Sequence, residues 1–243
     1  MAGDLLLLSN SAAFGGTFLG HAIDAVTDVL GGRRRLVFVP YALRDHADYT
    51  ATVRAALEPA GVTVAGLHEA ADPAEAVRRA EAVFVGGGNS FRLLRALQDL
   101  GLITEIRRRV RAGLPYLGSS AGTNMACPSL RTTNDMPIVE PASFAALGLV
   151  PFQINPHYLD PDPASRHMGE TRERRITEFL EENDVPVLGL REGSWLRVSG
   201  TRAGIGGASG ARLFRRGAEP RELVPGDDVS SLLTVPARFD IAP

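Results

Sequence analysis

The chain has no lysine, so all 26 of its basic residues are arginines. This absence excludes mechanisms that depend on a lysine side chain, namely a Schiff base, a Ser-Lys dyad or a phosphate-binding loop built on lysine. The chain also has a single cysteine, Cys127, and therefore cannot form an internal disulfide.

Long apolar runs and an excess of one charge are missing as well. The 26 basic and 28 acidic residues give a net charge of −2, which does not indicate a nucleic-acid or membrane-surface partner. The run Leu5–Leu8 lacks a basic flank and is too short for a signal peptide, and no run approaches the roughly 18 residues of a membrane span. We therefore expect a cytoplasmic protein. The sequence is compatible with a homodimer but does not decide the oligomeric state.

Apolar segments alternate with amphipathic ones along the chain as far as Ser120. Short apolar runs predict strands, and apolar residues at helical spacing predict helices. Asp72, followed by Pro73 and Glu75, is typical of a helix start. The predicted strands are Leu5–Leu8, Arg35–Pro40, Val62–Leu67, Ala82–Val85 and the run that ends at Gly118, and the predicted helices span residues 18–30, 49–57, 91–101 and 103–112, with another beginning at Asp72.

Strands that are apolar throughout, separated by amphipathic helices, predict an α/β fold with a mostly parallel sheet and helices on both faces. Beyond Ser120 the pattern is looser: we expect a helix over residues 171–182 and strands over 185–190, 195–198 and 212–214. The glycine-rich segment 199–212 is expected to form hairpin turns. Because no repeat or low-complexity boundary interrupts the chain, we expect residues 1–243 to form a single domain.

Glycine-rich turns follow three of the predicted strands, at residues 86–89, 118–122 and 191–194. Ligand sites in parallel sheets form beyond the carboxyl ends of the strands. The turn Gly118–Gly122 fits G-x-S-x-G, a nucleophile elbow in which small flanking residues allow a sharp strand–helix turn. We interpret Ser120 as the nucleophile and the N–H of Ala121 as an oxyanion donor. The alternative is a tight turn whose serine only caps the helix.

A serine nucleophile needs a base, and imidazole titrates near neutrality. His157 follows the apolar segment Phe152–Pro156, which proline is expected to end, so it would lie at another strand end. His167 lies in a polar loop and is a weaker candidate. The other histidines are expected at surface or structural positions: His21, His46 and His68.

The acid that orients the imidazole has two candidates, Glu192 and Asp135, each in a turn beside an apolar run. Glu192 is favoured because it closes the predicted strand over residues 185–190. Either acid would also fit as a turn former or a surface charge.

Neither a metal nor a nucleotide cofactor is expected. The chain has no H-E-x-x-H motif, no paired cysteines and no close pair of histidines. The glycine run that begins at Gly86 is not a G-x-G-x-x-G fingerprint, because Phe91 occupies the position of the last glycine.

Several segments together resemble the peptidase E family, the α-aspartyl dipeptidases. They are "LLLLSNS", "VGGGNSF", "GSSAGTNMACPSLRTTNDMPIV", "QINPHY", "GETRERRI" and "GLREGSW", and they extend over most of the chain except its C-terminal end. The resemblance implies a class I glutamine amidotransferase-like, flavodoxin-like fold. It also implies a serine exopeptidase without a cofactor that cleaves dipeptides with an N-terminal aspartate. Where the related amidotransferases carry a cysteine at the elbow, this chain has Ser120.

Carried over by position, the resemblance implies a role for each candidate residue. Ser120 would be the nucleophile, His157 the general base and Glu192 the orienting acid. Asp135 is the second choice for that acid. Gly88 would supply a second backbone N–H to the oxyanion.

A pocket for an aspartyl side chain requires a cation or several donors, because an unpaired carboxylate is costly to bury. Without lysine the cation must be arginine, which also holds a carboxylate through two hydrogen bonds. Arg172 in "GETRE" matches the family segment and is the first choice, with Arg131 second; a solvated helix face is the competing interpretation of Arg172. Asn89 would bind the substrate's amine or carboxylate, or cap the next helix.

Two other functions stay open on the sequence. One is a related serine hydrolase with another substrate, such as a cyanophycinase-like β-aspartyl peptidase or an esterase. The other is a non-catalytic small-molecule binder, against which the intact Ser120, His157 and Glu192 argue. An α-aspartyl enzyme needs a compact cationic slot for the acyl side of the substrate, whereas an esterase needs an apolar one.

Overall fold

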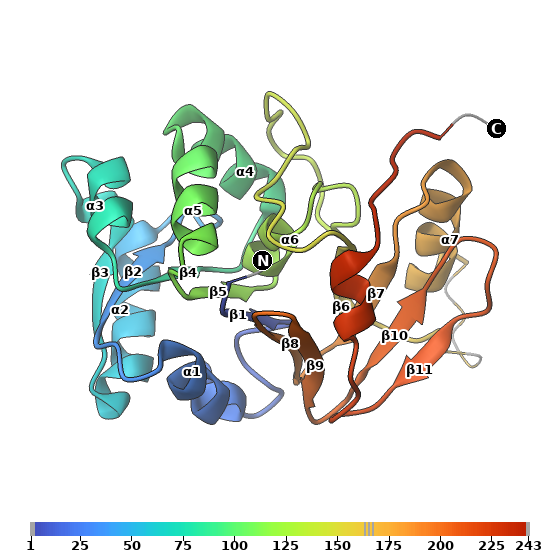
Figure 1. Ribbon diagram of the computed structural model, residues 1–243, viewed down its shortest axis with the longest axis horizontal. Helices are drawn as coiled ribbons and strands as arrows, with labels where there is room; N and C mark the ends of the chain where they lie inside the picture. The colour runs from blue at the N-terminus through green and yellow to red at the C-terminus, as the bar shows by residue number, and fades with distance from the viewer. Residues whose placement is uncertain (1–2, 163, 165, 167, 242–243) are drawn as a thin grey trace.

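The computed structural model describes residues 3–162, 164, 166 and 168–241, and it contains two β-sheets that lie side by side (Figure 1). The larger sheet has the strand order β3-β2-β4-β5-β1-β8-β9 and the smaller one the order β11-β10-β7-β6. The strands of the larger sheet are β1 (Leu5–Leu8), β2 (Arg35–Val39), β3 (Thr63–Gly66), β4 (Ala82–Val85), β5 (Tyr116–Ser119), β8 (Ser194–Ser199) and β9 (Arg202–Gly207). Those of the smaller sheet are β6 (Gln153–Tyr158), β7 (Val187–Arg191), β10 (Ala211–Phe214) and β11 (Arg221–Leu223).

Helices cover both faces of the larger sheet (Figure 1). Strands β3, β2, β4, β5 and β1 are parallel, and β8 and β9 add antiparallel strands at one edge. The predicted α/β fold with a mostly parallel sheet is thus confirmed. The helices are α1 (Ile23–Leu30), α2 (His46–Leu57), α3 (Pro73–Arg79), α4 (Ser90–Asp99), α5 (Leu102–Arg111), α6 (Ala121–Ala126) and α7 (Arg172–Glu182), and 3₁₀ turns span Gly20–Ala22, Glu58–Ala60, Leu67–Glu69 and Ser230–Thr234. Among the described residues, no helix combines the length and apolar character needed to cross a membrane.

Successive residues of a central strand face opposite helix layers, because side chains alternate across a strand. Leu5 and Leu7 of β1 pack in a cluster with α3, α4, α5 and α6, whereas Leu6 and Leu8 pack with α1 and α2. All four leucines are fully buried. A strand covered on both faces has no solvent-facing position, which explains its uninterrupted apolar run.

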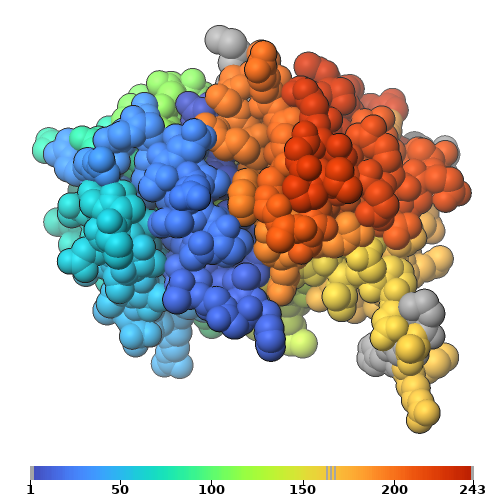
Figure 2. Space-filling model, turned by 90° about the horizontal axis from the view of Figure 1, so that it is seen from below, coloured from blue at the N-terminus to red at the C-terminus, as the bar shows by residue number. Residues whose placement is uncertain are grey.

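The smaller sheet shares the core of the larger one. One face, with Ile154, Leu188 and Leu190, joins the hydrophobic cluster that contains Leu5. The opposite face packs against α7, where Val187 belongs to the same cluster as residues of that helix. In Figure 2 the N-terminal segments, in blue, lie directly against C-terminal segments in orange. This shared core fixes the strand ends of the two sheets relative to each other.

The expectation that Pro156 ends its strand was wrong. β6 continues through Pro156 to Tyr158, with a register shift against β7 after Pro156. β6 lies at the edge of its sheet, and an edge strand tolerates proline because the missing N–H can face away from the ladder.

Two other segments also differ from expectation. Residues 199–212, predicted as hairpin turns, contain the whole of β9, and β11 was not predicted. The helix predicted over residues 18–30 is divided into a 3₁₀ turn and α1. Leu19 has a φ of 58°, so a continuous helix cannot begin before it.

A buried hydrogen bond ties β5 to the helix that follows it. The Tyr116 hydroxyl donates to the Gly122 carbonyl at 2.6 Å, and burial raises the pKa of Tyr116 well above its usual value, so the hydroxyl keeps its proton. We expect Tyr116→Phe to lower the free energy of unfolding by about 1–3 kcal/mol, because it leaves a buried acceptor without its donor. Chemical denaturation measures the change.

Tyr41→Phe is the matched control. Tyr41 is also buried, and within the described residues its hydroxyl makes no hydrogen bond. An equal loss of stability in both variants would mean that the Tyr116 bond contributes nothing of its own.

Candidate active site

Ser120 lies in the sharp turn between β5 and α6, with a φ of 51° and a ψ of −109°. Positive φ is uncommon for a residue other than glycine and marks local strain. A Cβ atom at position 118 would lie 2.6 Å from the Gly122 carbonyl oxygen, and one at position 122 would collide with the Val85 carbonyl. Only glycine fits at either position, so the turn has the backbone of a nucleophile elbow.

Ser120, His157 and Glu192 form a continuous chain of hydrogen bonds. His157 Nε2 lies 2.9 Å from Ser120 Oγ, and His157 Nδ1 lies 2.6 Å from Glu192 Oε1. With the proton of the neutral ring on Nδ1, the ring donates to Glu192 while Nε2 accepts from the serine hydroxyl. In this geometry an imidazole can remove the serine proton while a carboxylate fixes the tautomer of the ring.

The three side chains come from the two different sheets. Ser120 follows β5 of the larger sheet, whereas His157 lies on β6 and Glu192 in the turn between β7 and β8. His157 has a φ of 54°, an unusual backbone conformation at the irregular end of its strand. Its side chain is 39% exposed and that of Glu192 is 59% exposed, so the pair is open to solvent.

The two residues expected to donate backbone N–H groups to an oxyanion are Ala121, directly after Ser120, and Gly88, which lines the same cavity as Ser120. The N–H of Ala121 opens α6 and has no partner within that helix. Gly88 has a φ of 129°, and a Cβ atom there would lie 2.7 Å from the Ala42 carbonyl oxygen. The N–H of Gly87 is occupied, since it donates to the Tyr49 hydroxyl at 2.8 Å. Burial raises the pKa of Tyr49 to about 12, which keeps that hydroxyl neutral.

A cavity of about 380 Å³ opens beside the serine. Its volume lies in the range of small-molecule sites. None of the described arginines lines it. The lining residues are Asn10, Ser11, Ala12, Phe18, Leu43, Tyr49, Gly87, Gly88, Ser120, His157 and Glu192.

Asp135, the second candidate for the acid, lies elsewhere. Its carboxylate accepts hydrogen bonds from the N–H of Ser90, at 2.7 Å, and from the Ser90 hydroxyl. It therefore holds the first residue of α4, whereas the carboxylate in contact with His157 is that of Glu192.

Asn89 acts as a helix cap, one of the two roles considered for it. Its Oδ1 accepts from the Arg92 N–H at 3.0 Å at the start of α4. Its amide nitrogen donates to the Met136 carbonyl at 2.9 Å. These contacts join α4 to the segment that carries Asp135.

The two candidate arginines are in different surroundings. Arg131 makes two hydrogen bonds, of 2.6 and 2.9 Å, with the Asp240 carboxylate near the C-terminus, and the structure does not bring it to the cavity. Arg172 begins α7 and is half-buried, and the structure does not place it in the cavity lining either. Burial, and to a smaller degree the charge of Arg175, lower the pKa of Arg172, while Asp135 opposes this change. Within the described residues Arg172 forms no ion pair.

The histidines expected at structural positions lie outside the cavity lining. Burial lowers the pKa of His21, whose ring centroid lies 6.3 Å from that of Trp195. Burial and the neighbouring His68 lower the pKa of His46; their ring centroids are 5.6 Å apart. His167 lies outside the described residues.

Cys127 directly follows α6 and is fully buried. Burial raises the pKa of its thiol to about 12, so the thiol is not available as a nucleophile. Across the described part of the chain, no three His, Cys, Asp or Glu side chains are grouped so as to hold a metal ion.

Sequence reasoning missed Ser9 and Asn10, which directly follow β1. Ser9 Oγ accepts a hydrogen bond from the His157 N–H at 2.9 Å. Asn10 Oδ1 accepts one from the Gly193 N–H at 2.8 Å, beside Glu192. Their signal was position, because polar residues at the carboxyl end of a buried strand point to a site as glycine-rich turns do.

Proteins of known family match nearly the whole chain. The sequence pattern of peptidase family S51 matches residues 5–206. Peptidase E of Streptomyces coelicolor is 67% identical over 237 residues, 98% of each chain. The probable alpha-aspartyl dipeptidase of Drosophila melanogaster is 52% identical over 235 residues, 96% of this chain and 98% of that one.

Two solved structures have the same fold at low identity. A putative peptidase E from Listeria monocytogenes superposes with a TM-score of 0.65 at 22% identity and covers 85% of this chain and 99% of its own. A peptidase from an acI-B1 actinobacterium gives a TM-score of 0.69 at 16% identity, over 94% and 97% of the two chains. The family pattern and the close relatives leave one assignment: the chain belongs to peptidase family S51.

Proposed function

We propose that the protein is a serine-type exopeptidase that hydrolyses dipeptides with an N-terminal aspartate through an acyl-enzyme on Ser120. The observation that carries this proposal is the continuous chain of hydrogen bonds from Ser120 through His157 to Glu192, beside a cavity of about 380 Å³. Relatives named peptidase E and probable alpha-aspartyl dipeptidase, 67% and 52% identical, support the substrate class.

The chemistry follows from the positions of these atoms. His157 Nε2 removes the Ser120 proton as Oγ attacks the peptide carbonyl, and the N–H groups of Gly88 and Ala121 stabilise the oxyanion. The imidazolium gives its proton to the leaving amine, which departs as the C–N bond breaks and leaves an aspartyl ester on Oγ. Water, deprotonated by the same imidazole, then hydrolyses the ester and restores the serine hydroxyl. Glu192 orients the ring and stabilises the imidazolium in both steps.

Removal of the Ser120 hydroxyl tests the mechanism. We expect Ser120→Ala to lower turnover of Asp-Leu roughly 10⁴- to 10⁶-fold, because no acyl-enzyme can form. The melting temperature should stay close to that of the wild type, since alanine fits the turn as serine does. The assay compares hydrolysis of Asp-Leu, Asn-Leu, Glu-Leu and N-acetyl-Asp-Leu. The amount of leucine released measures both the turnover and the substrate preference. Near wild-type activity in this variant would rule out the acyl-enzyme.

Replacing each carboxylate by its isosteric amide distinguishes the role of Glu192 from that of Asp135. We expect Glu192→Gln to lower kcat roughly 10²- to 10⁴-fold, because the amide cannot stabilise the imidazolium. Asp135→Asn should instead raise KM more than it lowers kcat, and lower the melting temperature, because Asp135 holds the start of α4 and lies beside Arg172. A larger loss of kcat in Asp135→Asn than in Glu192→Gln would reverse the assignment.

Arg172 is the proposed partner of the aspartyl side chain. Its pKa is lowered by burial and it has no ion pair within the described residues, so a substrate carboxylate would supply a counter-charge. We expect Arg172→Met to lower kcat/KM for Asp-Leu roughly 10- to 150-fold, the value of a charged hydrogen bond, and for Asn-Leu much less. Arg174→Met is the matched control, because Arg174 lies on the same helix and pairs with Glu178 at 2.9 Å. Equal losses in both variants would contradict the role.

A related serine hydrolase of other specificity is the second candidate. Phe18 and Leu43 line the cavity, whereas no described arginine does, and this lining favours an apolar acyl group. Comparable cleavage of the four peptides, or cleavage of simple esters alone, would support this candidate. The cytoplasmic location, the lack of a nucleic-acid partner and the oligomeric state stay predictions.

A further inference from the structure

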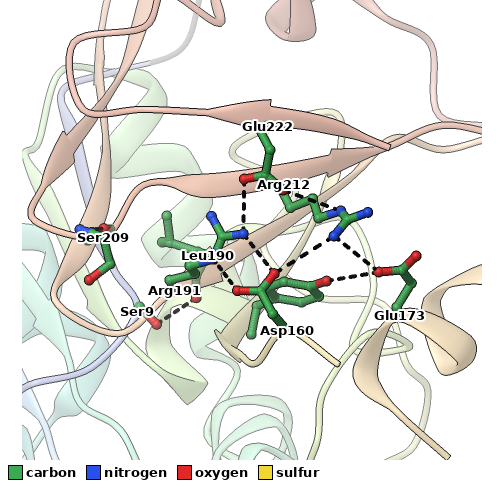
Figure 3. A network of polar contacts seen from close by, with 10 residues as sticks. Ser9, Asp160, Glu173, Leu190, Arg191, Ser209, Arg212 and Glu222 are labelled. Atoms are coloured by element: carbon green, nitrogen blue, oxygen red, sulfur yellow. Dashed lines mark hydrogen bonds and ion pairs between the residues drawn. The ribbon is translucent and has the colours of Figure 1, made fainter. Parts of the chain in front are cut away.

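Ser9 is a fully buried residue directly after β1, and its side chain connects β1 to the smaller sheet. Its hydroxyl accepts a hydrogen bond from the His157 N–H at 2.9 Å and donates one to the Leu190 carbonyl at 2.8 Å. The second bond is visible in Figure 3. The Ser9 N–H also donates to the Ser194 carbonyl at 3.0 Å. Ser9 therefore contacts the strand that carries the base and both strands that flank the acid.

The residue before it binds the nucleophile turn. The Leu8 carbonyl accepts hydrogen bonds from the Ser120 N–H at 3.1 Å and from Thr123 Oγ1 at 2.6 Å. Leu8 is also paired with Ser119 in the β1–β5 ladder. The last residue of β1 and the residue directly after it thus hold the nucleophile on one side and the base on the other.

The backbone N–H of His157 needs the Ser9 hydroxyl as its acceptor, because His157 is not paired with the neighbouring strand β7. The register of β6 against β7 shifts between Pro156 and Tyr158, and His157 has no partner in that ladder. Its φ of 54° is unusual for a residue with a side chain. A buried backbone N–H without an acceptor is destabilising, so Ser9 stabilises this conformation of the base.

Polar contacts around Arg191 join the segment that follows the base to the residue before the acid, and they do not involve Ser9 (Figure 3). Arg191, which precedes Glu192, makes two hydrogen bonds of 2.7 Å with Asp160, just beyond the end of β6. It makes a third, of 3.0 Å, with Glu222 on β11. Loss of the Ser9 hydroxyl should therefore displace the base and the acid together, as one unit, relative to the nucleophile.

We propose that Ser9 is a positioning residue that sets the distance between Ser120 and the His157–Glu192 pair. This inference rests on the proposed function. Ser9 does not line the cavity, so its removal should alter proton transfer from the serine without altering substrate binding. A displacement of the order of 1 Å at reacting groups can lower a rate about 10²-fold.

Ser9→Ala is compared with Thr50→Val. Thr50 is equally buried, its hydroxyl donates a hydrogen bond to the His46 carbonyl at 2.7 Å within α2, and it does not line the cavity. We expect Ser9→Ala to lower kcat for Asp-Leu about 10- to 100-fold with KM within about threefold of the wild type, whereas Thr50→Val keeps both values within about threefold. Assays are run well below the melting temperature of each variant.

Two measurements without peptide substrate separate positioning from general loosening. The rate at which a fluorophosphonate labels Ser120 should fall in Ser9→Ala in step with kcat, because labelling also needs the base. The downfield proton resonance of the His157–Glu192 hydrogen bond, assigned by its loss in Glu192→Gln, should persist in Ser9→Ala. Loss of that resonance would mean that Ser9 holds the pair together, which overturns the inference.

The inference also fails if Ser9→Ala has wild-type kcat, or if Thr50→Val loses as much activity as Ser9→Ala. The proposed function fails separately, through Ser120→Ala. If Ser120→Ala is inactive while Ser9→Ala and Thr50→Val behave alike, the acyl-enzyme mechanism stands and the role of Ser9 does not.

Discussion

The hydrogen bond between Ser120 and His157 crosses from one sheet to the other, and the packing of both sheets determines its length of 2.9 Å. A bond of this kind cannot be fixed by local sequence, because its two ends lie on strands that never pair. The hydrophobic cluster shared by the two sheets fixes their positions coarsely. Hydrogen bonds at the end of β1 then fix the positions of the two residues more closely. The Leu8 carbonyl holds Ser120, and the Ser9 hydroxyl holds His157.

Two of the four non-glycine residues with positive φ in the described part of the chain lie at the two ends of this bond. Ser120 and His157 both have positive φ, at 51° and 54°. Strained conformations persist where the surroundings over-determine them. At Ser120 the surroundings are close backbone contacts that only glycines at positions 118 and 122 permit. At His157 they are the irregular end of β6 and the hydrogen bond to Ser9. The backbone conformation of Ser120 is thus determined by the residue types around it, the two glycines. That of His157 depends on contacts with residues distant in the sequence.

This difference explains how much could be predicted from the sequence. The parallel strands and their helices follow from apolar periodicity, and the elbow follows from its glycines. His157 and Glu192 could be chosen by position at strand ends, because carboxyl ends of neighbouring strands meet at one edge. The continuation of β6 through Pro156 could not be predicted from the sequence, because a strand tolerates proline only where it lies at the edge of its sheet, as β6 does. Arg131 could not be separated from Arg172 either, since its partner Asp240 is 109 residues away.

Because the chain has no lysine, an arginine must bind the substrate carboxylate. The charges around each arginine determine which one is free to do so. Arg131 is neutralised by Asp240, whereas among the described residues the charge that offsets the burial of Arg172 is that of Asp135. That charge is shared, because the Asp135 carboxylate already accepts hydrogen bonds from Ser90. A substrate carboxylate beside Arg172 would therefore pair with a partly buried guanidinium whose charge Asp135 offsets incompletely. On the proposed function, Asp135, the second choice for the acid in the sequence, would contribute to the electrostatics of substrate recognition, whereas Glu192 orients the imidazole of His157 that transfers the proton.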